Sequence, residues 1–219
     1  MHFEFLVEDK SGKQALQLLI PKIIGNEHTY KIHAYRGIGH LPAGLRTVAQ
    51  PQHRALLSQL PRLLQGYGAT FNSYPTGYRK ALILVCDLDR ECRHDFRNEL
   101  INLLSQCDPR PDAYFCIAEE EMEAWFLGDK QAIIAAYAKA KISILESYVP
   151  DSICNSWELL ADAVHNGGAN ALSRRQYYEI GAAKCAWAQE IPLHMDIEQN
   201  ASPSFRYFRD KLREIAFKE

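Results

Sequence analysis

The chain has 219 residues, of which 47% are hydrophobic and 24% charged, and its formal net charge at pH 7 is −2. These values fit a globular protein with a substantial core, as one large domain or a domain with a smaller appendage. They exclude a strongly basic protein that binds nucleic acid through its bulk charge. No apolar run approaches the roughly 18 residues of a membrane span, so we expect no membrane association.

The N-terminal stretch and the cysteines point to the compartment. Residues 1–8 carry acids within an apolar run and lack a basic leader, so we expect no signal peptide. No C-x-x-C pair occurs among the six cysteines, which are Cys86, Cys92, Cys107, Cys116, Cys154 and Cys185. This pattern favours reduced thiols and a cytoplasmic location.

The first half of the chain alternates expected strands and helices. Strands are expected at residues 3–7, 30–35, 81–86 and 113–118, each a short apolar run. The first helix is expected to start at a Ser11 cap with Gln14 as its partner, and to end around Pro21 and Gly25. A second helix is expected at residues 52–65, interrupted near Pro61 and closed by Gly66 and Gly68, and a third at residues 91–106.

From Asp129 onward the pattern is helical. Helices are expected at residues 129–140, 157–164, 171–190 and 203–217, with Ser202 or Ser204 as the cap of the last one. Trp125, just before this part, is expected in the core. The sequence therefore predicts an α/β fold with a mostly parallel sheet flanked by helices at residues 1–128. An all-helical part at residues 129–219 is expected to pack on it.

Three of the expected strands end in clustered acids. Glu8 follows the first strand, and Asp87 and Asp89 follow the run at residues 81–86. Glu119, Glu120, Glu121 and Glu123 follow the strand at residues 113–118. In a parallel sheet these ends share one edge, where ligands commonly bind, and a divalent cation would offset the repulsion between the carboxylates. The simpler interpretations are an Asx turn or helix cap after the strand, and a solvated acidic helix start.

The motifs carry a resemblance. FLVE at residues 5–8 and VCDLD at residues 85–89, followed by the third acidic cluster, resemble the Toprim (topoisomerase–primase) fold in order and placement. More narrowly, IAEEEMEAWFLGD at residues 117–129 and NASPSFRYF at residues 200–208 are similar to an uncharacterised Toprim-like family of small bacterial proteins. In one departure, Asp9 follows Glu8 where the superfamily usually has glycine, and Gly12 comes later.

The resemblance implies a chemistry. It implies a nuclease that uses Mg²⁺ or Mn²⁺ to hydrolyse phosphodiester bonds in DNA or RNA, with one or two ions. Asp87 and Asp89 are then expected as direct ligands, and Glu8 as a ligand or as the base that accepts a proton from water. Glu120 and Glu123 lie three residues apart, so they share a helix face and would complete a second site.

Other residues near these acids are expected to have supporting roles. Glu119 and Glu121 are expected to be solvated or paired with lysine or arginine. Lys184 is a candidate phosphate contact from the helical part, although an isolated lysine usually faces solvent.

The resemblance also implies partners. Members of the family are often encoded beside an AAA or ABC-type ATPase, so we expect such a partner and an effector role in bacterial anti-phage defence, with a homo-oligomer as a further expectation. Two alternatives remain open. One is a non-catalytic subunit that docks on the ATPase and keeps the acidic rim for structure. The other is a Mg²⁺-dependent phosphatase of small substrates.

Overall fold

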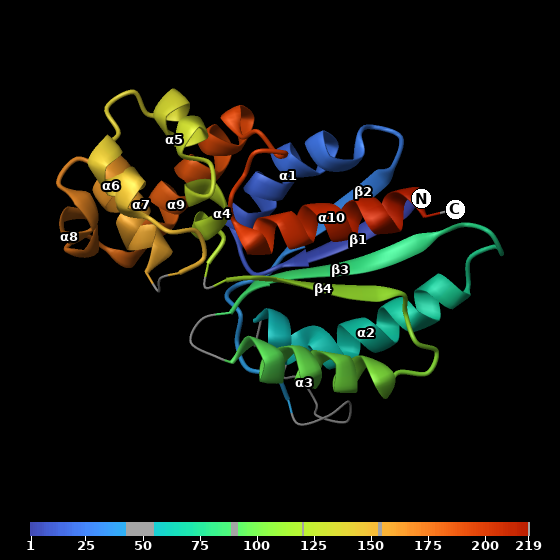
Figure 1. Ribbon diagram of the computed structural model, residues 1–219. Coiled ribbons are helices and arrows are strands. Elements are labelled where there is room, and N and C mark those ends of the chain that lie inside the picture. The colour runs from blue at the N-terminus through green and yellow to red at the C-terminus, as the bar shows by residue number, and fades with distance from the viewer. Residues whose placement is uncertain (43–54, 89–91, 120, 153–154, 219) are drawn as a thin grey trace.

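The structure is a computed structural model that describes residues 1–42, 55–88, 92–119, 121–152 and 155–218. Its centre is a four-stranded sheet in the order β2-β1-β3-β4, and all neighbouring strands run parallel (Figure 1). The strands are β1 (His2–Val7), β2 (Thr29–Ala34), β3 (Lys80–Asp87) and β4 (Ala113–Ala118). The predicted α/β fold is confirmed, and each strand end lies within about one residue of its predicted place.

The two faces of the sheet contribute to two apolar cores. Phe3, Phe5 and Val7 of β1 point into one core, whereas Leu6 of β1 and Leu84 of β3 belong to the other. Side chains alternate between the faces of a strand, so a strand with apolar residues at successive positions must be covered on both sides. The apolar runs that predicted buried parallel strands therefore describe the centre of this sheet.

Helices cover both faces (Figure 1). Helices α1 (Lys10–Ile24) and α10 (Pro203–Phe217) lie over one face, and α2 (Leu56–Asn72) and α3 (Arg93–Ser105) lie over the other. Helix α10 has its predicted bounds, because an apolar stripe at helical spacing is flanked by a serine–proline start. Its stripe is buried at Phe205, Phe208, Leu212 and Ile215.

The predicted start of α1 is wrong. Asp9, not Ser11, is the N-cap: its Oδ1 accepts a hydrogen bond from the Gly12 N–H at 2.7 Å. The Ser11 hydroxyl donates to the same carboxylate at 2.8 Å, so the aspartate satisfies two donors and shifts the cap toward the N-terminus. At the other end Gly25 is the C-cap, as predicted, but Pro21 lies inside the helix.

Helix α2 also extends farther than predicted. Pro61 lies inside the helix, and the helix continues through Gly66 and Gly68 instead of ending there. Gly68 serves a close approach, because a Cβ at this position would overlap the carbonyl oxygen of Pro109. The predicted first residue of the helix, Gln52, lies outside the described residues.

The C-terminal part is helical, as predicted. Between β4 and α10 the described helices are α4 (Glu123–Leu127), α5 (Lys130–Ala136), α6 (Ile142–Ser147), α7 (Ser156–Val164), α8 (Gly168–Ser173) and α9 (Tyr177–His194). The sequence did not predict α6 and α8. Helix α9 packs along α1, and the division of the chain at residue 128 stays a prediction. None of the helices in the described ranges is long and apolar enough to cross a membrane.

The Trp-containing motif and the start of α10 pack against each other. Trp125 is fully buried, as predicted, with its ring stacked on Phe208 at a centroid distance of 5.0 Å. Its indole N–H donates to the Ser204 hydroxyl at 3.0 Å, and the Asn200 amide donates to the Trp125 carbonyl at 2.8 Å. Ser202 caps α10 by accepting from the backbone at 3.2 Å. The two distinctive sequence motifs thus form one structural unit.

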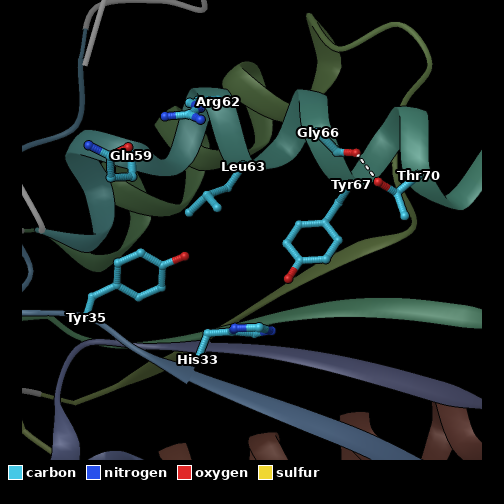
Figure 2. Close-up of a pocket in the computed structure, with 8 residues that line it drawn as sticks. All are labelled: His33, Tyr35, Gln59, Arg62, Leu63, Gly66, Tyr67 and Thr70. Carbon is cyan, nitrogen blue, oxygen red and sulfur yellow. Dashed lines mark hydrogen bonds between the residues drawn. The ribbon is translucent and has the colours of Figure 1, made fainter. Parts of the chain in front are cut away.

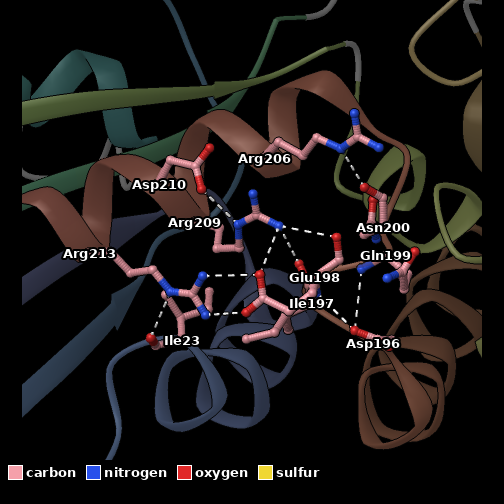
Figure 3. Close-up of polar contacts among 10 residues, drawn as sticks. All are labelled: Ile23, Asp196, Ile197, Glu198, Gln199, Asn200, Arg206, Arg209, Asp210 and Arg213. Carbon is pink, nitrogen blue, oxygen red and sulfur yellow. Dashed lines mark hydrogen bonds and ion pairs between the residues drawn. The ribbon is translucent and has the colours of Figure 1, made fainter.

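The basic face of α10 anchors neighbouring segments (Figure 3). Arg209 donates to the Ile197 carbonyl at 2.7 Å, and Arg213 donates to the Ile23 carbonyl at 3.2 Å. Arg213 also pairs with Glu198. These arginines hold the segment before α10 and the end of α1 in place, so their positive charges have structural contacts.

Candidate metal centre

The acidic strand ends meet at one edge of the sheet. Val7 of β1 pairs with Val85 of β3, and Asp87 at the end of β3 pairs with Ala118 at the end of β4. Because β1, β3 and β4 are parallel neighbours, Glu8, Asp87 and the acids after β4 lie at the same edge of the sheet. The predicted convergence of three acidic strand ends on one rim is therefore confirmed for the backbone.

Asp87 and Glu8 are brought together at this edge. Burial, followed by the neighbouring negative charge of Glu8, raises the pKa of Asp87 well above its ordinary value, while Lys184 acts in the opposite direction. Both side chains are half-buried. Burial and mutual repulsion both disfavour the ionised form of such a carboxylate pair. A bound cation would offset both effects, so the pair favours cation binding.

Lys184 enters the cluster from α9. Its Nζ lies 3.0 Å from Glu121 Oε1 and 3.4 Å from Glu123 Oε2, and the Glu123 side chain is only 3% exposed. Burial lowers the pKa of the lysine, but Glu123, Glu121 and Asp87 together outweigh burial and raise it. The lysine faces these carboxylates and not solvent. The sequence offered no signal for this, because Lys184 and Glu121 are 63 residues apart.

At Glu123 the effect of burial on the pKa outweighs the attraction to Lys184. Burial is the largest effect and raises the pKa of this carboxyl to about 7, although Lys184 opposes the shift. Lysine and glutamate in the same ion pair thus both have raised pKa values. The lysine has three acidic neighbours, whereas the glutamate has one cation and lies deeper in the protein.

Glu121 is held by three donors. Its Oε2 accepts from the Ser156 hydroxyl and the Trp157 N–H, each at 3.1 Å, and its Oε1 accepts from Lys184. The first two donors lie at the N-terminus of α7, where the helix dipole favours a negative charge. The predicted pairing of Glu121 with a basic residue is confirmed.

Glu119 is the outer member of the cluster. It pairs with Arg93 at 3.1 Å, as predicted, and both side chains are more than 30% exposed, at 32% and 40%. An ion pair this open contributes little to stability. The acids after β4 were expected to open a helix, but α4 begins only at Glu123, so Glu119 and Glu121 precede it.

Two predicted ligands lie outside the described residues, namely Asp89 and Glu120. In the part of the chain that is described, no group of three or more His, Cys, Asp or Glu side chains is arranged to hold a metal ion. Mg²⁺, however, often takes only one or two carboxylates and completes its coordination with water. Glu8 and Asp87 provide two hard oxygen donors in a negative setting, so this pair fits Mg²⁺ or Mn²⁺ in its chemistry.

Asp9, which directly follows Glu8, has a structural role. Its carboxylate caps α1, as described above, and its charge adds to the negative surroundings of Glu123. Gly12 allows the start of α1 to pack tightly, since a Cβ there would lie 3.3 Å from Asp9 Oδ1 and 3.5 Å from the Met122 methyl. Asp9 therefore caps α1 at the position where the Toprim resemblance predicts a glycine.

Fold and site together define an α/β protein with a mixed acidic and lysine cluster at the carboxyl edge of a parallel sheet. The chain belongs to the family described as Domain of unknown function (DUF4276), which matches residues 7–213. No curated protein and no solved structure matches the chain.

Proposed function

We propose that this protein is a Toprim-like nuclease that requires Mg²⁺ or Mn²⁺ and hydrolyses phosphodiester bonds in DNA or RNA. The observation that supports the proposal best is the pair of interacting carboxylates, Glu8 and Asp87, at the ends of adjacent parallel strands. Ligands of open α/β sheets bind at this edge. Glu8 and Asp87 also belong to two of the motifs that carry the Toprim-like resemblance.

The acidic residues would have different roles in catalysis. Glu8 and Asp87 would hold the ion, with Asp89 as a third ligand, and Glu120 and Glu123 would complete a second site. Bound metal would balance the charge of the scissile phosphate and lower the pKa of the attacking water. Glu8 is alternatively the base that accepts the proton of that water, because its half-buried carboxylate lies beside Asp87.

Lys184 supports this arrangement by balancing charge. Its ammonium group holds Glu121 and Glu123 at 3.0 and 3.4 Å and reduces the negative charge that Asp87 experiences. A cluster of several carboxylates with no cation would take up protons at neutral pH. The lysine therefore helps Asp87 to stay ionised, as a metal ligand must be.

The biological setting is proposed from the resemblance. It comprises a cytoplasmic effector of a bacterial anti-phage defence system, an AAA or ABC-type ATPase as partner, nucleic acid as substrate, and a homo-oligomer as assembly.

Nuclease assays test the proposal. Plasmid, single-stranded DNA and transfer RNA are incubated with the protein in Mg²⁺, Mn²⁺ or EDTA, with and without the ATPase encoded beside it. We expect cleavage only with a divalent ion, and a loss of about a hundredfold or more in Asp87→Asn. Asp95→Asn, an exposed position on α3, is the matched control and keeps full activity. Equal cleavage by wild type and Asp87→Asn contradicts the proposal, and so does the absence of metal-dependent cleavage in every combination.

One observation favours the alternative of a non-catalytic ATPase-binding subunit. Lys184 already supplies a cation to Glu121 and Glu123, so part of the acidic rim is balanced without metal. Thermal melting during Mg²⁺ titration separates the two functions. A nuclease is stabilised by the ion and loses this response in Asp87→Asn, whereas a structural rim shows no response. Hydrolysis of a small phosphate monoester, with no cleavage of nucleic acid, would identify the phosphatase alternative.

A further inference from the structure

A second site lies on the opposite side of β1 from α1. A pocket of about 490 Å³ opens between α2 and the end of β2 (Figure 2). Its lining includes His33 and Tyr35 from the β2 side and Arg62, Leu63 and Tyr67 from α2. A pocket of this volume, with an aromatic wall and a few polar groups, has the size and lining typical of small-ligand sites.

A hydrogen-bond network centred on Glu4 holds two of the lining side chains, His33 and Tyr67. Glu4 Oε2 accepts from His33 Nε2 at 2.6 Å and from the Tyr67 hydroxyl at 3.3 Å. On the other side Tyr67 packs against Phe71 at a centroid distance of 5.5 Å. The imidazole and the phenol are thus held in place before any ligand arrives, which lowers the cost of ordering them on binding.

Two polar groups at the pocket remain available to a ligand. Among the described residues, no hydrogen bond or ion pair engages the Tyr35 hydroxyl or the Arg62 guanidinium. Burial first, and then Glu4, raises the pKa of Tyr35 to about 12, so its hydroxyl is a neutral donor near pH 7. Arg62 is exposed at the α2 side of the pocket, where a guanidinium suits a phosphate or carboxylate.

The lining combines side chains that suit one class of ligand. Figure 2 shows Tyr35 and Tyr67 on either side of the pocket with His33 below them. Aromatic rings of this kind stack on nucleobases, and a nearby arginine binds the phosphate of the same nucleotide. Leu63 adds an apolar surface to the lining, and in Figure 2 it lies on the α2 side between the two tyrosines.

Backbone hydrogen bonds join the segment that carries Tyr35 to the segment that carries Glu8. The Tyr35 N–H donates to the Val7 carbonyl at 3.0 Å, and the Gly37 N–H donates to the Glu8 carbonyl at 3.2 Å. The chain that carries Tyr35 therefore runs beside the chain that carries Glu8. The pocket itself opens on the α2 face of the sheet, whereas Lys184 reaches the acids from α9, which packs along α1.

We propose that this pocket binds one nucleotide unit, with its base against Tyr35 and Tyr67 and its phosphate at Arg62. The unit is either a free nucleoside monophosphate or one residue of a single strand. This site does not depend on the metal centre, and binding at the pocket is distinct from hydrolysis.

Calorimetric titrations in EDTA test the proposal. The probes are the four common nucleoside monophosphates, the matching nucleosides, inorganic phosphate, and short single strands of DNA and RNA. We expect saturable binding of at least one monophosphate at micromolar to millimolar concentration. We expect weaker binding of its nucleoside, and no detectable binding of inorganic phosphate. Single strands that bind at least about tenfold more tightly than the monophosphate identify a strand as the ligand, and equal affinities identify the free nucleotide.

Variants assign the binding to this pocket. Tyr35→Leu removes the stacking ring and is expected to weaken binding about tenfold or more. Arg62→Gln is expected to weaken binding of the monophosphate and to leave binding of the nucleoside unchanged. Arg174→Gln, at an exposed arginine elsewhere, is the matched control, and circular dichroism confirms that each variant is folded.

Two outcomes overturn the proposal. One is that none of the monophosphates or strands binds to the folded wild type at millimolar concentration. The other is that they bind and that Tyr35→Leu and Arg62→Gln behave like Arg174→Gln. Asp87→Asn separates this proposal from the nuclease proposal, because it is expected to abolish cleavage and to leave nucleotide binding in EDTA intact.

Discussion

Replacing Glu123 with glutamine is expected to stabilise the metal-free protein at neutral and alkaline pH. Glu123 is 3% exposed, and burial raises its pKa from an ordinary value of 4.5 to about 7 despite Lys184 at 3.4 Å. At about 1.4 kcal/mol for each pH unit, the ionised carboxylate costs the folded protein about 3 kcal/mol. Glutamine keeps the shape of the side chain and carries no charge, so Glu123→Gln avoids this cost.

The effect has a defined pH window. Because the pKa of Glu123 is higher in the folded protein than in the unfolded chain, the folded protein binds more protons between pH 4.5 and about 7. The free energy of unfolding of the wild type therefore falls as the pH rises through this window. Glu123→Gln lacks this decrease. The two proteins are expected to be equally stable near pH 4.5 and to differ by about 3 kcal/mol at about pH 8.

Urea unfolding in EDTA across this range measures the difference. Glu99→Gln, at an exposed glutamate on α3, is the control and should follow the wild type at every pH. With Mg²⁺ at a hundred times its dissociation constant, the wild type should gain about 2.7 kcal/mol and Glu123→Gln less. If Glu123→Gln is less stable than the wild type at alkaline pH in EDTA, attraction to Lys184 outweighs burial and the reasoning is refuted.

Three other substitutions test helix packing and capping by thermal or urea unfolding. Gly66→Ala should stabilise the protein by about 0.5–1 kcal/mol, because Gly66 lies inside α2 and an added Cβ meets no other atom within 4 Å. Gly68→Ala, in the same helix, should destabilise the protein by about 2 kcal/mol, because the added Cβ would overlap the Pro109 carbonyl oxygen. Equal effects of the two glycine substitutions would contradict this account. Asp129→Ala should cost about 2–4 kcal/mol, because the 9% exposed carboxylate accepts from two backbone N–H groups, at 3.0 and 2.8 Å; a loss below about 0.5 kcal/mol would refute its capping role.

Strand positions and the last helix could be predicted because their signals are local. Apolar runs of six or so residues identified β1, β3 and β4, and the stripe after Ser202 identified α10. Helix ends were harder. Pro21, Pro61 and Gly66 lie inside helices because apolar neighbours on the same helices are buried, and this burial outweighs the local cost of a proline or glycine.

The candidate site could be predicted only in part. The acidic strand ends were recognisable, and their shared edge was predicted, but the strand order that puts β1 beside β3, and so Glu8 beside Asp87, came from the structure. Glu119 and Glu121 were predicted to be either solvated or paired with basic residues; the structure shows pairing, and the identities of Arg93 and Lys184 were not predicted. The pocket at Tyr35 and Tyr67 had no sequence signal, because its residues come from β2 and α2 at spacings that match no motif.

The sequence by itself determined the alternating strands and helices and the acids that end three strands, because these features depend on neighbours within one strand or one helical turn. Only the tertiary structure decided which charges meet. The packing of α9 along α1 accompanies the approach of Lys184 to Glu121 and Glu123, and the contact of α2 with the sheet forms the pocket at Tyr35 and Tyr67. Such contacts join residues far apart in the chain, and their geometry follows from how apolar helix faces fit together, which no local pattern records.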